Sequence, residues 1–322
     1  WANASDQLIA LAERLTVPVI TTEMGRGSIP EDHVLSGGIV GHFGHSTANG
    51  LVREADVVLG LGSRFLNVNT INWSLIPENA KIIQVENDPL EIGKQYAVTL
   101  GVHADSGAFL DDLLVHLEAD NLQVEGGADH PRVKRVAELA ADQERRYYDT
   151  DLDAVPIKPQ RITRAIEQVC DADAIYVLGS GLHTQWAHGI KIRKPDQYHL
   201  PVGSGTMAWA LPGAIGAKLA QPDRQVVVCI GDGDFGMNAQ EIETSVREET
   251  PIIIVIYNDC SYGALRVFQK AHYGGRFIGS HFGPTDHIKL AEAYGARGER
   301  VEQPGDLVGA LECLVDSFHD LW

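Results

Sequence analysis

Basic charge is scarce in this sequence of 322 residues, where 26 Lys and Arg stand against 44 Asp and Glu and the formal net charge is −18. Nucleic acids and anionic membranes attract proteins through a basic face, so we expect neither as a partner. No apolar run approaches the length that spans a bilayer, and from the pattern at the start of the sequence we expect no signal peptide.

Cysteine is also rare. The chain has four cysteines, which lie far apart and form no Cys-x-x-Cys pair: Cys170, Cys229, Cys260 and Cys313. This spacing is typical of neither a disulfide framework nor a zinc site, and it indicates a reducing, cytoplasmic location. A start Met is missing as well, because the chain opens at Trp1 and a helical pattern follows at once. We therefore expect a longer parent chain.

Helix and strand patterns alternate along the chain, which predicts parallel sheets covered on both faces. The apolar runs at residues 17–20, 57–62, 81–85, 174–178, 225–230 and 251–257 read as strands. Helical patterns cover residues 46–55, 108–117, 132–148, 161–169, 207–219 and 238–248. We predict an α/β fold with two doubly wound domains at residues 1–122 and 156–322. Residues 123–155 are interpreted as an exposed linker that carries one helix.

A glycine-rich turn with two acids follows the apolar strand at residues 225–230. This turn is Gly231-Asp232-Gly233-Asp234, and a helix begins a few residues later. Strand, glycine turn and helix together direct backbone N–H groups toward an anion. Gly-Asp-Gly alone is more often a simple turn, so the pattern needs a second signal.

The second signal is Asn258-Asp259, at the end of the next predicted strand. Parallel strands end at the same edge of a sheet, where ligands of open α/β folds bind, so Asp232 and Asp259 should converge. Carboxylates, a backbone carbonyl and phosphate oxygens suit Mg²⁺. A polar strand end or a helix cap is the simpler alternative for Asn258-Asp259.

These segments together resemble thiamine-diphosphate enzymes of the acetolactate synthase and 2-keto acid decarboxylase family. That family's signature is Gly-Asp-Gly followed, after 24 to 27 residues, by Asn-Asn. Residues 203–217 resemble its segment against the aminopyrimidine ring, and residues 179–186 its first diphosphate loop. Residues 24–33 and 60–65 resemble the middle domain of acetolactate synthases. The resemblance covers essentially the whole chain.

The resemblance implies thiamine diphosphate and Mg²⁺ as cofactors and assigns residues to each. The metal ligands would be Asp232, Asp259 and the Ser261 carbonyl. The cofactor-binding residues would be Ser180, Gly181, Leu182, His183, Gly205, Met207, Gly231, Gly233, Asp234, Tyr262 and Gly263. Among these, the Gly205 carbonyl would accept from the 4′-amino group, and Met207 would support the bent cofactor. The family usually has a second Asn where this chain has Asp259, which is also a competent Mg²⁺ ligand.

The family's catalytic Glu belongs to an N-terminal pyrimidine-binding domain that these residues do not match, so we assign no catalytic residue to this chain. We expect that domain to come from the same parent chain or from a second subunit. Family active sites form between two chains, which implies a homodimer or homotetramer. The 322 residues alone should therefore be inactive.

The resemblance implies a carboligase acting on a small-molecule 2-keto acid, like acetolactate synthase. A benzoylformate decarboxylase-like lyase is the alternative, because Phe268 stands where the synthases carry Trp. A non-catalytic nucleotide-binding protein is the alternative from another class. FAD is a further open question. Residues on FAD-contacting positions are Gly41, Gly62, Ser63, Arg64 and Glu86, whereas Leu66 and Val68 replace a family Asp and Arg.

Overall fold

The computed structural model describes residues 2–201 and 203–320, except the side chains of residues 317–320. Trp1 and residues 321–322, the outer ends of the two predicted domains, lie outside the described residues. Contacts divide the chain into two compact units. Unit 1 runs to Tyr147 and includes Ile192–Pro195, and unit 2 comprises Tyr148–Lys191 and the chain from Asp196 onward. Among the described residues, no helix is long and apolar enough to cross a membrane.

Unit 1 carries two parallel sheets, β1-β2 and β3-β4-β5, in which every paired strand runs in the same direction. Its helix α3 begins where the Asp105 side chain accepts hydrogen bonds from two backbone N–H groups, a standard N-cap. The elements are α1 (Ser5–Leu15), β1 (Val19–Thr21), β2 (Ser36–Ile39), α2 (Ser46–Arg53), β3 (Val57–Leu61), β4 (Lys81–Glu86), β5 (Leu100–His103), α3 (Ser106–Ala119) and α4 (Pro131–Tyr147), with a short 3-10 helix at Glu23–Gly25.

Helix α4 lies within the segment that the sequence suggested as a linker, yet it packs on α2 of unit 1. The Arg135 guanidinium donates to both carboxylate oxygens of Glu54, at 3.0 and 2.5 Å. Gln143 Oε1 accepts from the Thr47 backbone N–H at 3.1 Å and from its hydroxyl at 2.9 Å. These contacts are long-range, so the local charge pattern did not reveal that the helix belongs to this unit.

Unit 2 is built on one parallel sheet in the order β7-β6-β8-β9. Its strands are β6 (Ile175–Leu178), β7 (Tyr198–His199), β8 (Val226–Gly231) and β9 (Ile253–Tyr257). The helices are α5 (Pro159–Val169), α6 (His183–Ala187), α7 (Ala210–Ala220), α8 (Asp232–Phe235), α9 (Glu241–Arg247), α10 (Gly263–His272), α11 (His287–Ala293) and α12 (Leu307–Asp320), with 3-10 turns at Pro195–Gln197 and Pro304–Asp306.

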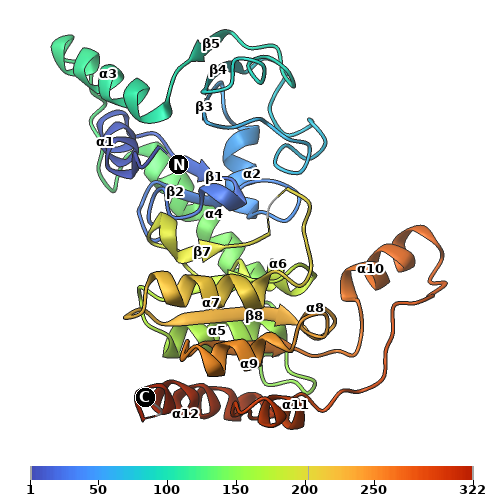
Figure 1. Cartoon of the computed structure of the whole chain (residues 1–322). Coiled ribbons are helices and arrows are strands. Elements are labelled where there is room, and N and C mark those ends of the chain that lie inside the picture. The colour runs from blue at the N-terminus through green and yellow to red at the C-terminus, as the bar shows by residue number, and fades with distance from the viewer. Residues whose placement is uncertain (1, 202, 321–322) are drawn as a thin grey trace. The chain divides into compact units, whose positions relative to one another are not determined.

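The core of unit 2 explains why β8 reads as a continuous apolar run. Val226, Val228 and Ile230 pack with Leu211 of α7 and Ile242 of α9. The run is fully buried because helices lie on both sides of the strand, with α5 opposite α7 and α9 (Figure 1). The alternating pattern thus correctly predicts the α/β class with parallel sheets.

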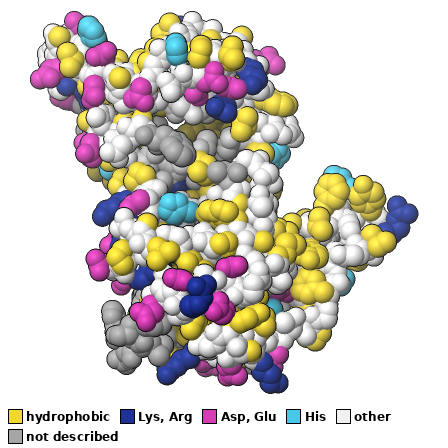
Figure 2. Space-filling model, in the orientation of Figure 1, with side chains coloured by type: hydrophobic (Ala, Val, Ile, Leu, Met, Phe, Trp, Pro, Cys, Tyr) yellow, Lys and Arg dark blue, Asp and Glu magenta, His cyan; other side chains and the backbone are white. Residues whose placement is uncertain are grey.

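Helix α10 projects from the rest of unit 2 and has no buried residue (Figure 1). Hydrophobic side chains gather on this projecting segment, as the space-filling view shows (Figure 2). The exposed ones are Leu265, Val267, Phe268, Tyr273, Phe277 and Ile278. The Gln269 side chain joins α10 to the returning chain, donating to the Ile278 carbonyl at 2.9 Å and accepting from the Ser280 hydroxyl at 3.0 Å.

Candidate cofactor site

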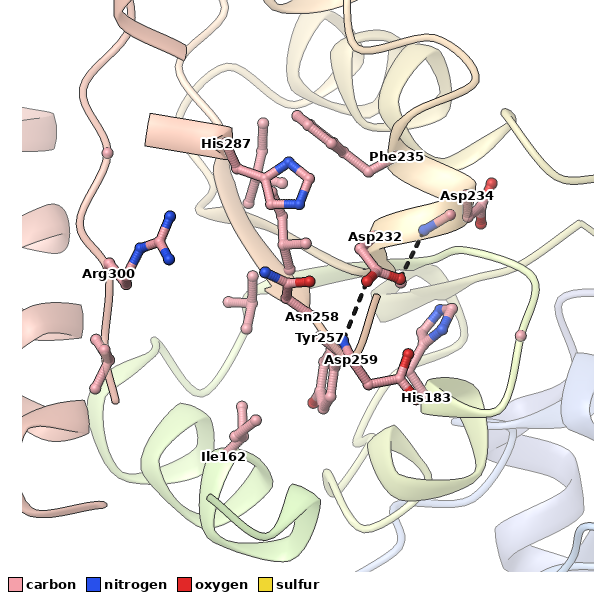
Figure 3. A pocket seen from close by; sticks show the side chains of 18 of the residues that line it. Ile162, His183, Asp232, Asp234, Phe235, Tyr257, Asn258, Asp259, His287 and Arg300 are labelled. Carbon is pink, nitrogen blue, oxygen red and sulfur yellow. Dashed lines mark hydrogen bonds between the residues drawn. The ribbon is translucent and has the colours of Figure 1, made fainter. Parts of the chain in front are cut away.

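Three loops meet at the carboxyl edge of the unit 2 sheet, where β6, β8 and β9 end. They line a cavity of about 1190 Å³ (Figure 3). The cavity wall includes all 14 residues that were assigned to cofactor or metal from the sequence. These residues are Ser180, Gly181, Leu182, His183, Gly205, Met207, Gly231, Asp232, Gly233, Asp234, Asp259, Ser261, Tyr262 and Gly263.

 All of the assigned residues therefore line one cavity, although they come from loops that are far apart in the sequence.

The Asp232 carboxylate joins the ends of β8 and β9. It is 4% exposed, and its Oδ1 accepts from the Gly233 N–H at 2.8 Å. Its Oδ2 accepts from the N–H groups of Asp259 at 3.1 Å and Cys260 at 2.6 Å. Burial raises the pKa of the Asp232 carboxyl, and the charge of Asp259 also raises it, whereas the Cys260 and Gly233 amides lower it. The predicted convergence of the two acids is thus present in the fold.

Asp259 is oriented by its own loop. Its Oδ1 accepts from the Ser261 hydroxyl at 2.8 Å, and Ser261 forms an isolated antiparallel bridge with His281. The hydrogen bonds of that bridge run from the Tyr262 N–H to the Ser280 carbonyl and from the Phe282 N–H to the Cys260 carbonyl. They do not use the Ser261 carbonyl, which sequence reasoning assigned to the metal.

The donor set fits Mg²⁺ shared with a phosphate better than a metal held by protein alone. Within residues 2–201 and 203–320, no group of three or more His, Cys, Asp or Glu side chains could hold a metal ion. Asp232 and Asp259 place two carboxylates, whose oxygens are of the hard kind that Mg²⁺ prefers, at neighbouring strand ends. Mg²⁺ is commonly bound by one or two carboxylates together with phosphate oxygens and water, and the two acids fit this mode of binding.

The first loop, after β6, presents backbone N–H groups to the cavity, but not all of them are available. The Ser180 N–H donates to Asp234 Oδ2 at 2.7 Å. The main-chain N–H groups of Gly181, Leu182 and His183 have no acceptor in the described chain. These three groups are therefore available to an anion, whereas the Ser180 amide is already used.

The His183 imidazole lies beneath this loop. A Cβ atom at Gly181 or at Gly231 would lie 3.0 Å from the ring, so both glycines make room for it. The ring is 6% exposed, and among the described residues its Nε2 has no hydrogen-bond partner. Burial lowers the pKa of His183 to about 4, against weak opposing effects of the Gly179 and Cys229 backbone. The imidazole is therefore neutral at neutral pH.

The Tyr262 ring leaves no room for a side chain at position 233 of the turn. Its ring packs so closely on Gly233 that a Cβ there would lie 2.6 Å from Tyr262 Cε1. The ring also meets Phe282 edge-on, with 5.1 Å between centroids. Gly263 lies next to Asp259 and Leu182, where a Cβ would make ordinary contacts at 3.6 Å. The glycine at position 233 is thus required by packing, and the glycine at position 263 is not.

Sequence reasoning missed the role of the Asp234 side chain, because it assigned only the backbone N–H of that residue. The carboxylate accepts from the Ser180 N–H and, at 2.5 Å, from the Ala208 N–H. Burial raises the pKa of Asp234, and these two amides lower it. The signal in the sequence was an acid two residues after Asp232, but its partners lie in distant segments.

The histidines near the end of the chain do not form one cluster. His272 stacks on Phe268 within α10, and His281 meets the ring of Phe277. His287 instead meets Phe235 of α8, close enough to Asp232 for the charge of that acid to raise its pKa, although burial lowers it more. Only His287 of these three lines the large cavity.

The positions that the resemblance suggested for FAD in unit 1 lie at or shortly after the ends of its strands. Glu86 ends β4, and its Oε1 accepts from the N–H groups of Asn87 at 3.0 Å and Asp88 at 3.3 Å. The Ser63 carbonyl accepts from Gln84, and the Arg64 side chain is exposed. The Glu86 carboxylate is therefore hydrogen-bonded within the turn that follows β4.

Comparison with known proteins gives two family models that match in order along the chain. Residues 1–113 match the thiamine pyrophosphate enzyme central domain, and residues 179–318 match the C-terminal TPP binding domain. A probable acetolactate synthase large subunit of Methanococcus aeolicus is 34% identical over 98% of this chain and 54% of its own length. The corresponding protein of Methanocaldococcus jannaschii is 35% identical over 97% of this chain and 53% of its own length.

The acetolactate synthase large subunit of Corynebacterium glutamicum is 32% identical over 97% of this chain and 50% of its own length. The chain thus spans about half the length of the curated relatives that it matches. The segment that matches the C-terminal TPP binding domain, residues 179–318, contains the loops after β6, β8 and β9.

Proposed function

The chain belongs to the thiamine pyrophosphate enzyme family, and on that premise we propose that the cavity of unit 2 holds the cofactor's diphosphate through Mg²⁺. The observation that carries this proposal is the convergence of Asp232 and Asp259 beside the free N–H groups of Gly181–His183. Thiamine diphosphate itself fits the family, whereas the metal and its ligands are our proposal.

Each residue has a definite task in this proposal. Asp232 and Asp259 bind the cation, and the Ser261 carbonyl completes the protein's share of its ligands. The N–H groups of the first loop bind the diphosphate oxygens. The Asp234 N–H also has no acceptor in the described chain, so it can donate in the same way. Gly205 and Met207 line the same cavity and orient the aminopyrimidine ring.

When bound, thiamine diphosphate supplies a nucleophilic carbon that adds to the carbonyl of a 2-keto acid and accepts the electrons released with CO₂. The residues of this chain bind and orient the cofactor for that chemistry. We propose that the full-length protein is a carboligase, which adds the resulting fragment to a second carbonyl compound. The support is that the relatives named above are acetolactate synthase large subunits, each 32–35% identical to this chain.

A decarboxylase is the second candidate, and one residue favours it. Phe268 lies on α10 where the synthases carry Trp, and its ring is 53% exposed. Incubating the full-length protein with pyruvate, thiamine diphosphate and Mg²⁺ separates the two reactions. A carboligase yields acetolactate, whereas a decarboxylase yields an aldehyde. Acetaldehyde as the main product would reject the carboligase.

We propose that the catalytic Glu lies in a pyrimidine-binding domain outside these 322 residues, in the same or a second chain. A general acid–base group contributes about 10²–10⁴-fold, and the ring-binding wall would be absent as well. The 322-residue chain should therefore release no CO₂ from pyruvate or benzoylformate above the rate of free cofactor. Robust turnover by this chain would mean that the Glu is within it.

We also propose that the protein is a homodimer or homotetramer, because the family builds each site between two chains. Light scattering of the full-length protein tests this, and a monomer at all concentrations would contradict it. FAD in unit 1 remains a proposal of the resemblance alone, and a flavin absorbance spectrum of the purified protein tests it. A cytoplasmic location stays a prediction from the cysteine pattern.

A further inference from the structure

The Asp234 carboxylate holds together two loops that are not adjacent in the sequence. Asp234 is 2% exposed and lies on the same turn as Asp232 (Figure 3). Its Oδ2 accepts from the N–H of Ser180, after β6, and its Oδ1 accepts from the N–H of Ala208, before α7. We call this pair of hydrogen bonds the Asp234 bridge.

The bridge ends on a residue with an unfavourable backbone. Ala208 has φ +67°, in the left-handed region that residues with a Cβ rarely adopt. Its N–H donates to Asp234, and its carbonyl accepts from the Asn238 side chain at 2.5 Å. Two side chains that follow β8 thus hold Ala208 on both sides, and they fix the segment that contains Gly205 and Met207.

The bridge has a steric partner in Gly179. A Cβ atom at this position would overlap Asp234 Oδ2, so the carboxylate fits only against a glycine. Gly179 follows directly after β6, and its N–H donates to the Cys229 carbonyl of β8 at 2.9 Å. Gly179 and Asp234 therefore depend on each other, although they belong to different strand ends.

We propose that Asp234 is a positioning residue. Its side chain holds the first loop and the Gly205–Met207 segment in place beside the Gly231–Asp234 turn, which carries the proposed metal ligand Asp232. The inference rests on the proposed function. The carboxylate contacts the cofactor only indirectly, since both of its oxygens accept from protein N–H groups. Its role is to order two loops before the cofactor binds, so that the binding free energy is not used to order them.

The test is Asp234→Asn in the full-length protein. Asn keeps the size of the side chain, but its NH₂ group must face one of the two N–H donors. We expect the Kd of thiamine diphosphate, measured by tryptophan fluorescence with Mg²⁺, to rise at least about tenfold, as the loss of a hydrogen bond to a charged group implies. The circular dichroism spectrum should stay unchanged.

Pyrophosphate with Mg²⁺ is the second ligand of the test. Pyrophosphate should contact the first loop and the Gly231–Asp234 turn but not the Gly205–Met207 segment. Its Kd should therefore rise less than that of thiamine diphosphate. Equal losses for both ligands would indicate a merely structural role and would overturn the inference. Unchanged or tighter binding of thiamine diphosphate would overturn it too, because removal of a negative charge by itself favours an anion.

Gly179→Ala provides an independent variant in which residue 234 is still Asp. Its Cβ displaces the carboxylate, so we expect a similar rise in the Kd of thiamine diphosphate. The double variant should be little worse than either single one, because both remove the same bridge. Gly216→Ala is the matched control, since a Cβ at Gly216 of α7 meets no atom within 4 Å. Additive effects of Gly179→Ala and Asp234→Asn would contradict the shared bridge.

Binding of thiamine diphosphate by the wild-type protein distinguishes a failure of the role of Asp234 from a failure of the proposed function. If the wild-type protein binds no thiamine diphosphate with Mg²⁺, the proposed function fails, and the inference fails with it. If the wild type binds and both variants bind equally well, only the role of Asp234 is wrong.

Discussion

The two units use the same sequence of strand, turn and helix, but their acids at the strand ends bond differently. In unit 1, the Glu86 carboxylate accepts from the next two N–H groups of its own turn. In unit 2, the Asp232 carboxylate accepts from the loop of the neighbouring strand, and it lines a large cavity beside Asp259. The shared architecture thus provides the edge of the sheet in both units, whereas the side chains at that edge determine whether it can bind a ligand.

The greatest loss of cofactor affinity is expected when the Asp232 carboxylate is removed. Asp232→Ala removes a proposed Mg²⁺ ligand and should weaken Mg²⁺-dependent binding of thiamine diphosphate by more than about 100-fold, while the fold persists. Asp259→Asn restores the family pattern and should keep most of the affinity. Isothermal titration of the full-length protein measures both, and equal damage from the two variants would place Asp259 outside the metal site.

Asp105→Ala is the control for this experiment in unit 1. Asp105 also accepts from two backbone N–H groups, at the start of α3. Its loss should cost about 1 kcal/mol of stability, as for other helix N-caps, and leave the Kd of thiamine diphosphate unchanged. A loss of cofactor affinity in Asp105→Ala would mean that the titration reports general stability.

A smaller effect concerns pH. The pKa of His183 falls from 6.5 to about 4 on folding, because the imidazole is buried. Between these values the unfolded chain binds more protons than the folded chain, so stability is lost as pH falls from about 6.5 to about 4. The loss contributed by His183 is on the order of 3 kcal/mol. Urea denaturation across this range should show a shallower decline in His183→Gln than in the wild type, and parallel declines would refute the assignment.

The smallest effect compares two glycines. A Cβ at Gly60 of β3 would overlap the buried Phe65 ring, and a Cβ at Gly233 would press on the partly buried Tyr262 ring. We expect Gly60→Ala to cost about 1–3 kcal/mol of unfolding free energy and to leave cofactor affinity unchanged. Gly233→Ala should cost less stability but weaken thiamine diphosphate binding. Urea denaturation and titration of both variants check this, and the reverse pattern would contradict the contrast.

The sequence predicted the strands of unit 2 well because they are buried on both faces. The runs at residues 225–230 and 251–257 correspond to β8 and β9 within about two residues. The convergence of Asp232 and Asp259 followed from the rule that parallel strands end at one edge. By contrast, β2 was not predicted, since Ser36-Gly37-Gly38-Ile39 contains little that favours a strand.

The start of α7 and the Asp234 bridge could not be predicted from the local sequence, because both depend on contacts between distant segments. The predicted helix begins at residue 207, but α7 begins at Ala210, because Ala208 is held in a left-handed conformation. In that conformation the Ala208 N–H donates to Asp234 and its carbonyl accepts from Asn238, and both partners follow another strand. Tertiary contacts of this kind override the helix propensity of an Ala-rich run.

The central claim is that the edge of the unit 2 sheet binds thiamine diphosphate through Mg²⁺. The most direct measurement is a titration of the full-length protein with thiamine diphosphate, first with Mg²⁺ and then with EDTA. Saturable binding that requires Mg²⁺ and is lost in Asp232→Ala is the predicted result. Absence of binding with Mg²⁺, or binding that persists in EDTA and in Asp232→Ala, would contradict the account.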